Sequence, residues 1–198
     1  MKRNQYTLGK PISFKGNGLH SGIPVTITMR PAPAGSGIIF RRIDLTGAPE
    51  VPAKSEFVTN TLRATTLERG NAKVFTVEHI LSALFALRID NCILEIDAPE
   101  PPVADGGALT FSQMILEAGI VELEEQTDIL TLETSVAVYE DNKFITALPY
   151  DGLRITFTSI NPHPLLGTQM KDFTIDKETY IREIAPSRTI GFTWELEA

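Results

Sequence analysis

The sequence has few of the residues that build disulfides and metal sites. It contains one cysteine, Cys92, and three histidines, His20, His79 and His163, among 198 residues. A single cysteine cannot form an intramolecular disulfide, which favours a reducing compartment. No apolar run approaches the roughly 20 residues of a membrane span, and the first five residues lack the apolar core of a signal peptide. We therefore expect a cytoplasmic protein without a transmembrane segment.

Positive charge is also scarce. Lysine and arginine number 18 against 25 aspartates and glutamates, which gives a formal net charge of -7. A nucleic-acid-binding surface normally needs a basic face, so the composition argues against nucleic acid as a partner. It leaves room for a local basic groove that binds a small anion. The length and the 42% hydrophobic content are enough for a real core, in one large domain or two small ones.

Residues 76–85 predict an amphipathic helix. Thr76 suits the N-cap, where its hydroxyl would accept a hydrogen bond from an unpaired backbone amide. Glu78 and His79 then fall in the first turn, where the helix dipole favours a carboxylate and a neutral imidazole. Such a pair suits a general base beside a metal ion, although a glutamate in a first turn is also ordinary capping electrostatics. The apolar residues recur at helical spacing: Val77, Ile80, Leu81, Leu84 and Phe85.

Strands precede helices in both halves of the chain, which predicts an α+β fold class. The acidic segment 122–127 is interpreted as a linker between a domain of residues 1–121 and a domain of residues 128–198. The predicted strands are residues 25–29, 38–42, 57–58, 62–67 and 91–96, then 129–132, 135–139, 143–148 and 153–158, with two short runs within 6–14; helices are predicted at 109–118 and 176–184.

Two loops differ in composition from the rest of the chain. Residues 16–22 are glycine-rich and include His20, and they suit a tight hairpin as well as a binding loop. Residues 97–107 contain three prolines and end in Asp-Gly-Gly, which indicates a shaped loop rather than a flexible linker.

Five segments together closely resemble the UDP-3-O-acyl-N-acetylglucosamine deacetylases, the zinc amidases of lipid A biosynthesis in Gram-negative bacteria. The segments are residues 16–22, 76–84, 89–91, 97–106 and 187–192, in that order. The resemblance implies two layered β-α-α-β domains with the active site between them. It also implies hydrolysis of the acetamide of a UDP-linked acylated glucosamine, with Zn²⁺ as cofactor.

The same resemblance implies roles for individual residues. Glu78 matches the general base and His79 a zinc ligand, and a zinc ion lowers the pKa of its bound water towards about 7. Thr189 matches a residue that stabilises the oxyanion, although it could also be an N-cap for the element that starts near Ser187. Four residues match the acyl-chain channel of the family, although they could equally be plain core. Two histidines match positions that line the cleft, and one of them, His163, lies between two prolines and suits a structural loop. The channel residues are Leu19, Leu62, Ile190 and Phe192, and the cleft residues are His20 and His163.

The remaining ligands of the family are missing. In the family, a His-x-x-x-Asp pair on a later helix completes the zinc site, and no such pair occurs here. The chain is therefore expected to be a C-terminally truncated piece of a longer enzyme, with an incomplete second domain and no activity of its own. The alternative is a short relative that serves as a non-catalytic nucleotide-sugar or acyl-chain binding module. Some family members also carry a C-terminal hydroxyacyl dehydratase domain, so a fused domain is a further possibility.

Overall fold

The core of the protein is a five-stranded sheet with β9 in its middle. The computed structural model describes residues 2–191, and its largest sheet has the order β2-β3-β9-β4-β5. β9 runs parallel to β4, and all the other neighbours are antiparallel. The bounds of these strands are β2 (Ile12–Asn17), β3 (Pro24–Pro31), β4 (Ile38–Arg42), β5 (Glu50–Pro52) and β9 (Cys92–Ile96).

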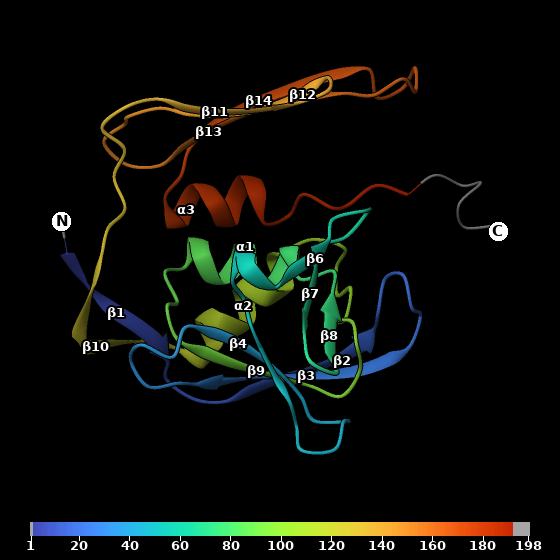
Figure 1. The fold of residues 1–198 in the computed structure, drawn as a ribbon, viewed down its shortest axis with the longest axis vertical. Helices are drawn as coiled ribbons and strands as arrows, with labels where there is room; N and C mark the ends of the chain where they lie inside the picture. The colour runs from blue at the N-terminus through green and yellow to red at the C-terminus, as the bar shows by residue number, and fades with distance from the viewer. Residues whose placement is uncertain (1, 192–198) are drawn as a thin grey trace.

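Two helices, α1 (Glu78–Ala86) and α2 (Leu109–Ala118), cover one face of this sheet (Figure 1). Phe40 of β4, Ile80 of α1 and Ile115 of α2 belong to the one cluster of buried side chains between them. Burial of this apolar surface is the main favourable contribution to folding. No helix within residues 2–191 is long and apolar enough to cross a membrane.

A small sheet leads the chain into α1. It consists of β6 (Val58–Asn60), β7 (Thr66–Arg69) and β8 (Ala72–Phe75), and it follows the short 3₁₀ turn η1 (Ser55–Phe57). The predicted strand at 62–67 is wrong over most of its length, because β7 begins only at Thr66 and the residues before it form a bend. Leu62 therefore lies in an exposed bend rather than in a strand.

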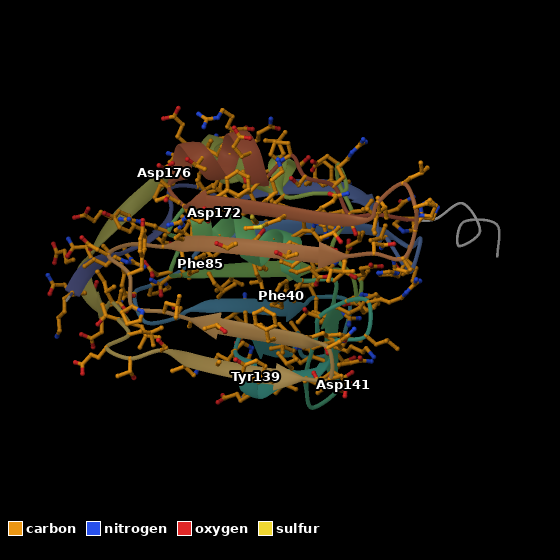
Figure 2. All side chains as sticks on the ribbon, turned by 90° about the horizontal axis from the view of Figure 1, so that it is seen from above. Phe40, Phe85, Tyr139, Asp141, Asp172 and Asp176 are labelled. Carbon is orange, nitrogen blue, oxygen red and sulfur yellow. The ribbon has the colours of Figure 1, made fainter. Side chains whose placement is uncertain are left out.

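Several elements have the predicted bounds, and the α+β fold class is confirmed. β4 coincides with the predicted strand, as does α2 with the predicted helix, which ends at Gly119 with a φ of +78°. β3 alternates between buried and less buried residues, as its sequence predicts. Of the predicted apolar stripe, Val77, Ile80 and Leu84 are buried and Leu81 is half-buried, whereas Phe85 is 69% exposed (labelled in Figure 2).

The acidic segment 122–127 is part of a paired strand. β10 (Ile120–Asp128) pairs antiparallel with β1 (Lys2–Leu8), beside the main sheet. Glu122 accepts hydrogen bonds from the Asn4 amide, at 2.6 Å, and from the Tyr6 hydroxyl, at 2.8 Å. The segment predicted as a linker thus carries side chains that hold the N-terminal strand. The division into two domains stays a prediction.

The second half of the chain forms an outer layer of two hairpins above the helices (Figures 1 and 2). Asp141 lies in the turn of the first hairpin, as predicted, with a φ of +50°. Residues 129–132 form no strand, which corrects that prediction, and the last of the four strands was not predicted at all. The strands are β11 (Val136–Glu140), β12 (Lys143–Ala147), β13 (Arg154–Ile160) and β14 (Thr168–Thr174).

Apolar side chains on this layer are largely exposed. Tyr139 and Phe144 stack with ring centroids 6.0 Å apart, yet both remain exposed, as do Ile145 and Phe157. The strands therefore pair with each other without burying their side chains among residues 2–191.

The layer joins the core through a short helical segment. α3 (Lys177–Thr179) begins at Asp176, whose carboxylate accepts a hydrogen bond from the Thr179 amide at 2.7 Å. It continues as the π-type turn η2 (Tyr180–Ile184), in agreement with the predicted helix. Tyr180 is buried, and its hydroxyl lies 2.8 Å from the Ser82 hydroxyl of α1.

Candidate active site

The Glu-His pair occupies the first turn of α1, as predicted. The helix begins at Glu78, and both Glu78 and His79 are half-buried. Thr76, however, is not the N-cap, because Val77 precedes the helix and no side chain caps it. Thr76 instead adopts a φ of +56°, and its hydroxyl donates a hydrogen bond to Glu100 at 2.7 Å. Glu78 therefore lies at the positive end of the helix dipole, and no side-chain hydroxyl caps the helix there.

Both residues of the pair are held by their neighbours. The Glu78 carboxylate accepts a hydrogen bond from the Thr65 amide at 3.1 Å, which links the bend before β7 to the helix. The His79 carbonyl accepts a hydrogen bond from the Ser82 hydroxyl at 2.9 Å. Because Ser82 also bonds Tyr180, the first turn of α1 is tied to η2. These bonds hold the Glu78 carboxylate and the backbone of the first turn in place.

An open cavity of about 600 Å³ brings together three of the predicted site residues, Leu19, Thr189 and Ile190. Thr189 is held there by its own amide, which donates to the Gly106 carbonyl at 2.8 Å. Residues 187–191 form neither helix nor strand, so Thr189 caps no element of the described chain. The rest of the lining is Val103, Gly106, Arg188 and Gly191.

The segment that carries Thr189 packs closely on the start of α2. A Cβ at Gly107 would stand 2.8 Å from the Ser187 carbonyl oxygen and 2.9 Å from that of Ala185. Both distances are too short for a carbon atom, so only glycine permits this approach. The Ala108 amide also donates to the Ala185 carbonyl at 3.0 Å. The Asp-Gly-Gly end of the proline-rich loop therefore positions Thr189.

Three of the four predicted acyl-channel residues lie in the described chain, and all three are surface residues, not core. Leu19 is 38% exposed, Leu62 81% and Ile190 61%, so the alternative that they are plain core is wrong. Leu19 and Ile190 line the same cavity, whereas Leu62 does not. The fourth channel residue, Phe192, lies outside the described residues. Two of these apolar side chains are therefore available to an apolar ligand in the cavity.

The two histidines predicted at the cleft have different surroundings. His20 is exposed on the tight turn of residues 16–22, where the Gly22 amide donates to the Gly18 carbonyl at 3.2 Å. His163 lies in the loop between β13 and β14, outside the lining of the cavity. Its ring nitrogen Nδ1 accepts a hydrogen bond from the Leu165 amide at 3.2 Å. That bond supports the structural role that the sequence left open for His163.

The described residues do not complete a metal site. Within residues 2–191, no group of three or more His, Cys, Asp or Glu side chains could hold a metal ion. His79 is therefore a single potential ligand there, short of the three protein ligands of a catalytic zinc site.

Sequence reasoning missed one residue of this region, Glu100. Its side chain has no exposed surface, although it stands in a proline-rich loop where a charged residue is expected to face water. No feature of the local sequence signals its burial, because its partners are 24 and 80 residues away.

The described chain thus has a carboxylate and an imidazole at the start of α1, and a cavity lined by a threonine and apolar side chains. Groups of these kinds are candidates for an enzyme active site. A family model described as "LpxC: UDP-3-O-acyl N-acetylglycosamine deacetylase" matches residues 5–198. The chain belongs to the LpxC family.

Similar curated proteins agree with this assignment. A bifunctional enzyme LpxC/FabZ of Chlorobaculum tepidum is 43% identical over 198 residues, covering 98% of this chain and 42% of the relative. UDP-3-O-acyl-N-acetylglucosamine deacetylases of Legionella pneumophila (strain Corby) and Myxococcus xanthus (strain DK1622) are each 41% identical. Those matches cover 98% of this chain and 64% and 62% of the two enzymes. The chain thus spans less than two thirds of the length of the relatives it matches.

Proposed function

We propose that the protein acts in zinc-dependent hydrolysis of the acetamide of UDP-3-O-acyl-N-acetylglucosamine, an early committed step of lipid A synthesis in the cytoplasm of Gram-negative bacteria. The observation that carries the proposal is the Glu78–His79 pair in the first turn of α1, in a chain of the LpxC family. The Legionella pneumophila and Myxococcus xanthus relatives support the substrate class through their own names.

Each residue then has a chemical task. Glu78 takes the proton of the attacking water, a role for which general bases typically contribute a 10²- to 10⁴-fold rate increase. Thr189 offers its hydroxyl to the oxyanion that forms when the acetamide carbonyl becomes tetrahedral. Leu19, Leu62 and Ile190 offer exposed apolar surface to the acyl chain. His20 and His163 are proposed to contact the substrate at the cleft, and Phe192 to extend the apolar wall.

Zinc is proposed as the cofactor, with His79 as one of its ligands. When bound, it would polarise the acetamide carbonyl and make its bound water more acidic. Residues 2–191 do not supply the rest of a site, so we propose that these 198 residues alone do not catalyse the reaction.

The second candidate is a non-catalytic module that binds a nucleotide sugar or an acyl chain. The specific observation in its favour is that His79 is the only zinc ligand the family resemblance assigns to residues 2–191, while the cavity keeps its apolar wall. A C-terminal dehydratase domain, which the family resemblance raises as a possibility, is a proposal for this protein, and the C. tepidum relative is named as a bifunctional enzyme.

The decisive experiment is Glu78→Gln in the protein expressed from its complete gene. Glutamine keeps the shape of the side chain but cannot take a proton. We expect acetate release from UDP-3-O-acyl-N-acetylglucosamine to fall by about 10²- to 10⁴-fold. The zinc content should stay at the wild-type value, because Glu78 is not a proposed ligand.

Glu117→Gln is the matched control, since Glu117 is an exposed glutamate on α2, away from the cavity lining. It should release acetate at the wild-type rate. Full activity of Glu78→Gln would remove Glu78 from the mechanism. If the wild-type protein binds the UDP-sugar but releases no acetate, the binding-module function is correct instead.

A further inference from the structure

Glu100 is a fully buried carboxylate with a complete set of donors. Its oxygens accept hydrogen bonds from the His20 amide at 3.0 Å, the Ser21 amide at 2.8 Å and the Thr76 hydroxyl at 2.7 Å. Its side chain has no exposed surface. Burying an unpaired carboxylate is very unfavourable, and donors such as these offset the cost. These hydrogen bonds compensate the carboxylate of Glu100 for its loss of water.

The carboxylate joins three segments that are distant in sequence. It belongs to the proline-rich loop 97–107, and its donors belong to the glycine-rich turn 16–22 and to the junction between β8 and α1. Backbone hydrogen bonds run alongside, from the Phe75 amide to the Pro99 carbonyl at 3.0 Å and from the Val103 amide to the Asn17 carbonyl at 2.8 Å. Glu100 is the side chain that touches both of the other segments.

The turn of residues 16–22 packs tightly against the Glu100 carboxylate at Gly18. A Cβ built at Gly18 would overlap both the Glu100 carboxylate and the Ser21 hydroxyl. The turn can therefore approach the carboxylate only with glycine at this position.

Thr76 is held in a conformation that its side chain disfavours. A φ of +56° is uncommon for any residue other than glycine and rarer still for a β-branched one. Such conformations persist only when surrounding contacts enforce them. The hydrogen bond from the Thr76 hydroxyl to Glu100 is such a contact, and it lies two residues before Glu78. This bond therefore holds the junction between β8 and α1, together with the backbone bond from Phe75 to Pro99.

We propose that Glu100 is a positioning residue that fixes the turn carrying Leu19 and His20 relative to the helix start carrying Glu78 and His79. The proposal rests on the function proposed above. The bonds from His20 and Ser21 hold the turn that carries Leu19 of the cavity wall. The bond from Thr76 holds the start of the helix that carries Glu78, the proposed base. Loss of the carboxylate would let the two move apart, and small misplacements of reacting groups can cost about 10²-fold in rate.

The test compares Glu100→Gln and Thr76→Val in the protein expressed from its complete gene. Glutamine keeps the volume but loses the charge and one acceptor oxygen, so we expect kcat/KM to fall about 10- to 100-fold. Valine keeps the branched shape of Thr76 and removes only its hydroxyl. We expect Thr76→Val to lower kcat about tenfold with little change in KM, because the bonds to the 16–22 turn remain.

Two controls separate positioning from general effects. Glu95→Gln makes the same chemical change at a β9 glutamate that pairs with Arg30 and Arg41 instead. Thr76→Ser keeps the hydroxyl, and it should restore activity to within about threefold of wild type if the bond to Glu100 is what matters. The double variant Glu100→Gln/Thr76→Val should lose less activity than the product of the two single losses, because the two positions share a hydrogen bond.

Several outcomes would overturn the proposal. Activity of Glu100→Gln within twofold of wild type would do so, as would losses equal to those of Glu95→Gln. A lower unfolding midpoint with unchanged kcat and KM of the folded fraction would reduce Glu100 to a purely structural residue. If the wild-type protein releases no acetate, the proposed function fails, and amide NMR then decides on Glu100 alone. The His20 and Ser21 amide resonances should shift in Glu100→Gln and not in Glu95→Gln, and unchanged resonances would exclude the contact in solution.

Discussion

Cys92, the only cysteine of the chain, lies on the central strand with no exposed surface. Burial raises the pKa of its thiol to about 12. The thiolate is the reactive form of cysteine, so both access and ionisation are suppressed in the folded protein. We expect fewer than about one in ten molecules to react with an aromatic disulfide reagent at pH 8 in an hour, and complete reaction in denaturant. A full equivalent of rapid reaction under native conditions would contradict the buried position of β9.

At the same scale, some side-chain roles could be read from the sequence and others could not. Glu78 and His79 stand where the helical pattern put them, because local spacing decides which residues enter a first turn. The hydroxyl of Thr76 could not be assigned, since a group that suits an N-cap also suits a carboxylate brought close only by the fold. The burial of Glu100 depends in the same way on segments distant in sequence.

Burial alone would raise the pKa of Glu100, but the His20 and Ser21 amides, together with the Ser21 and Thr76 side chains, lower it below its ordinary value. A carboxyl group with a lowered pKa stabilises the folded state above its unfolded pKa, near 4.3, and that contribution is lost as the pH falls through the folded value. The contacts of Glu100 are therefore intact at neutral pH.

Among the elements, the β13–β14 hairpin carries an exposed ion pair. The Arg154 guanidinium, and after it the Thr156 hydroxyl, lower the pKa of Asp172 to about 2. Because this pKa lies below the unfolded value of about 3.9, the pair supports the hairpin above pH 4 and is lost as the pH falls towards 2. We expect a carbon-13 NMR titration of Asp172 to show a midpoint near 2.

Arg154→Gln should move that midpoint up towards the ordinary value, since it removes the largest cause of the shift. Arg182→Gln, which removes a charge paired with Glu178 and Glu183, should leave it unchanged. A wild-type midpoint near 4 would show that the pair does not form in solution.

The elements of the first half were more predictable than those of the second. β3 shows regular alternation and α2 helical periodicity, and both contribute side chains to the buried core, which explains why the patterns predict them. β14, with the sequence Thr-Gln-Met-Lys-Asp-Phe-Thr, has no such alternation, because its side chains are exposed on both faces. The apolar run 129–132 has no partner strand in the described chain and therefore forms none.

On the scale of the whole molecule, the zinc stoichiometry of the 198-residue polypeptide tests the metal proposal. We expect less than one zinc ion per chain to survive gel filtration after incubation with excess zinc, because a catalytic site needs about three protein ligands. Atomic emission on the eluted protein would measure it, with His79→Ala as the matched variant. One zinc per chain, lost in His79→Ala and accompanied by acetate release, would show that the polypeptide holds a complete site.

The arrangement of the outer layer was beyond sequence reasoning. Alternating residues such as Val136 and Val138 predict strands, and strands form there, but both side chains stay more than half exposed. A pattern of alternation indicates that one face of a strand can be buried without naming what buries it. The predicted two-domain layout therefore depends on contacts that the pattern does not contain.

The position of β9 in the middle of the main sheet has a consequence for the order in which the protein can be made. A ribosome completes β2, β3, β4 and β5 before it reaches β9, so a nascent chain that ends before Cys92 has two pairs of strands with nothing between them. The facing edges of β3 and β4 stay open during that interval, and open edges invite pairing with other chains. The sheet is complete only when its central strand is inserted. β1 stays unpaired for longer, until β10 has been synthesised. Synthesis of this protein therefore passes through a stage in which pairing with other chains competes with folding.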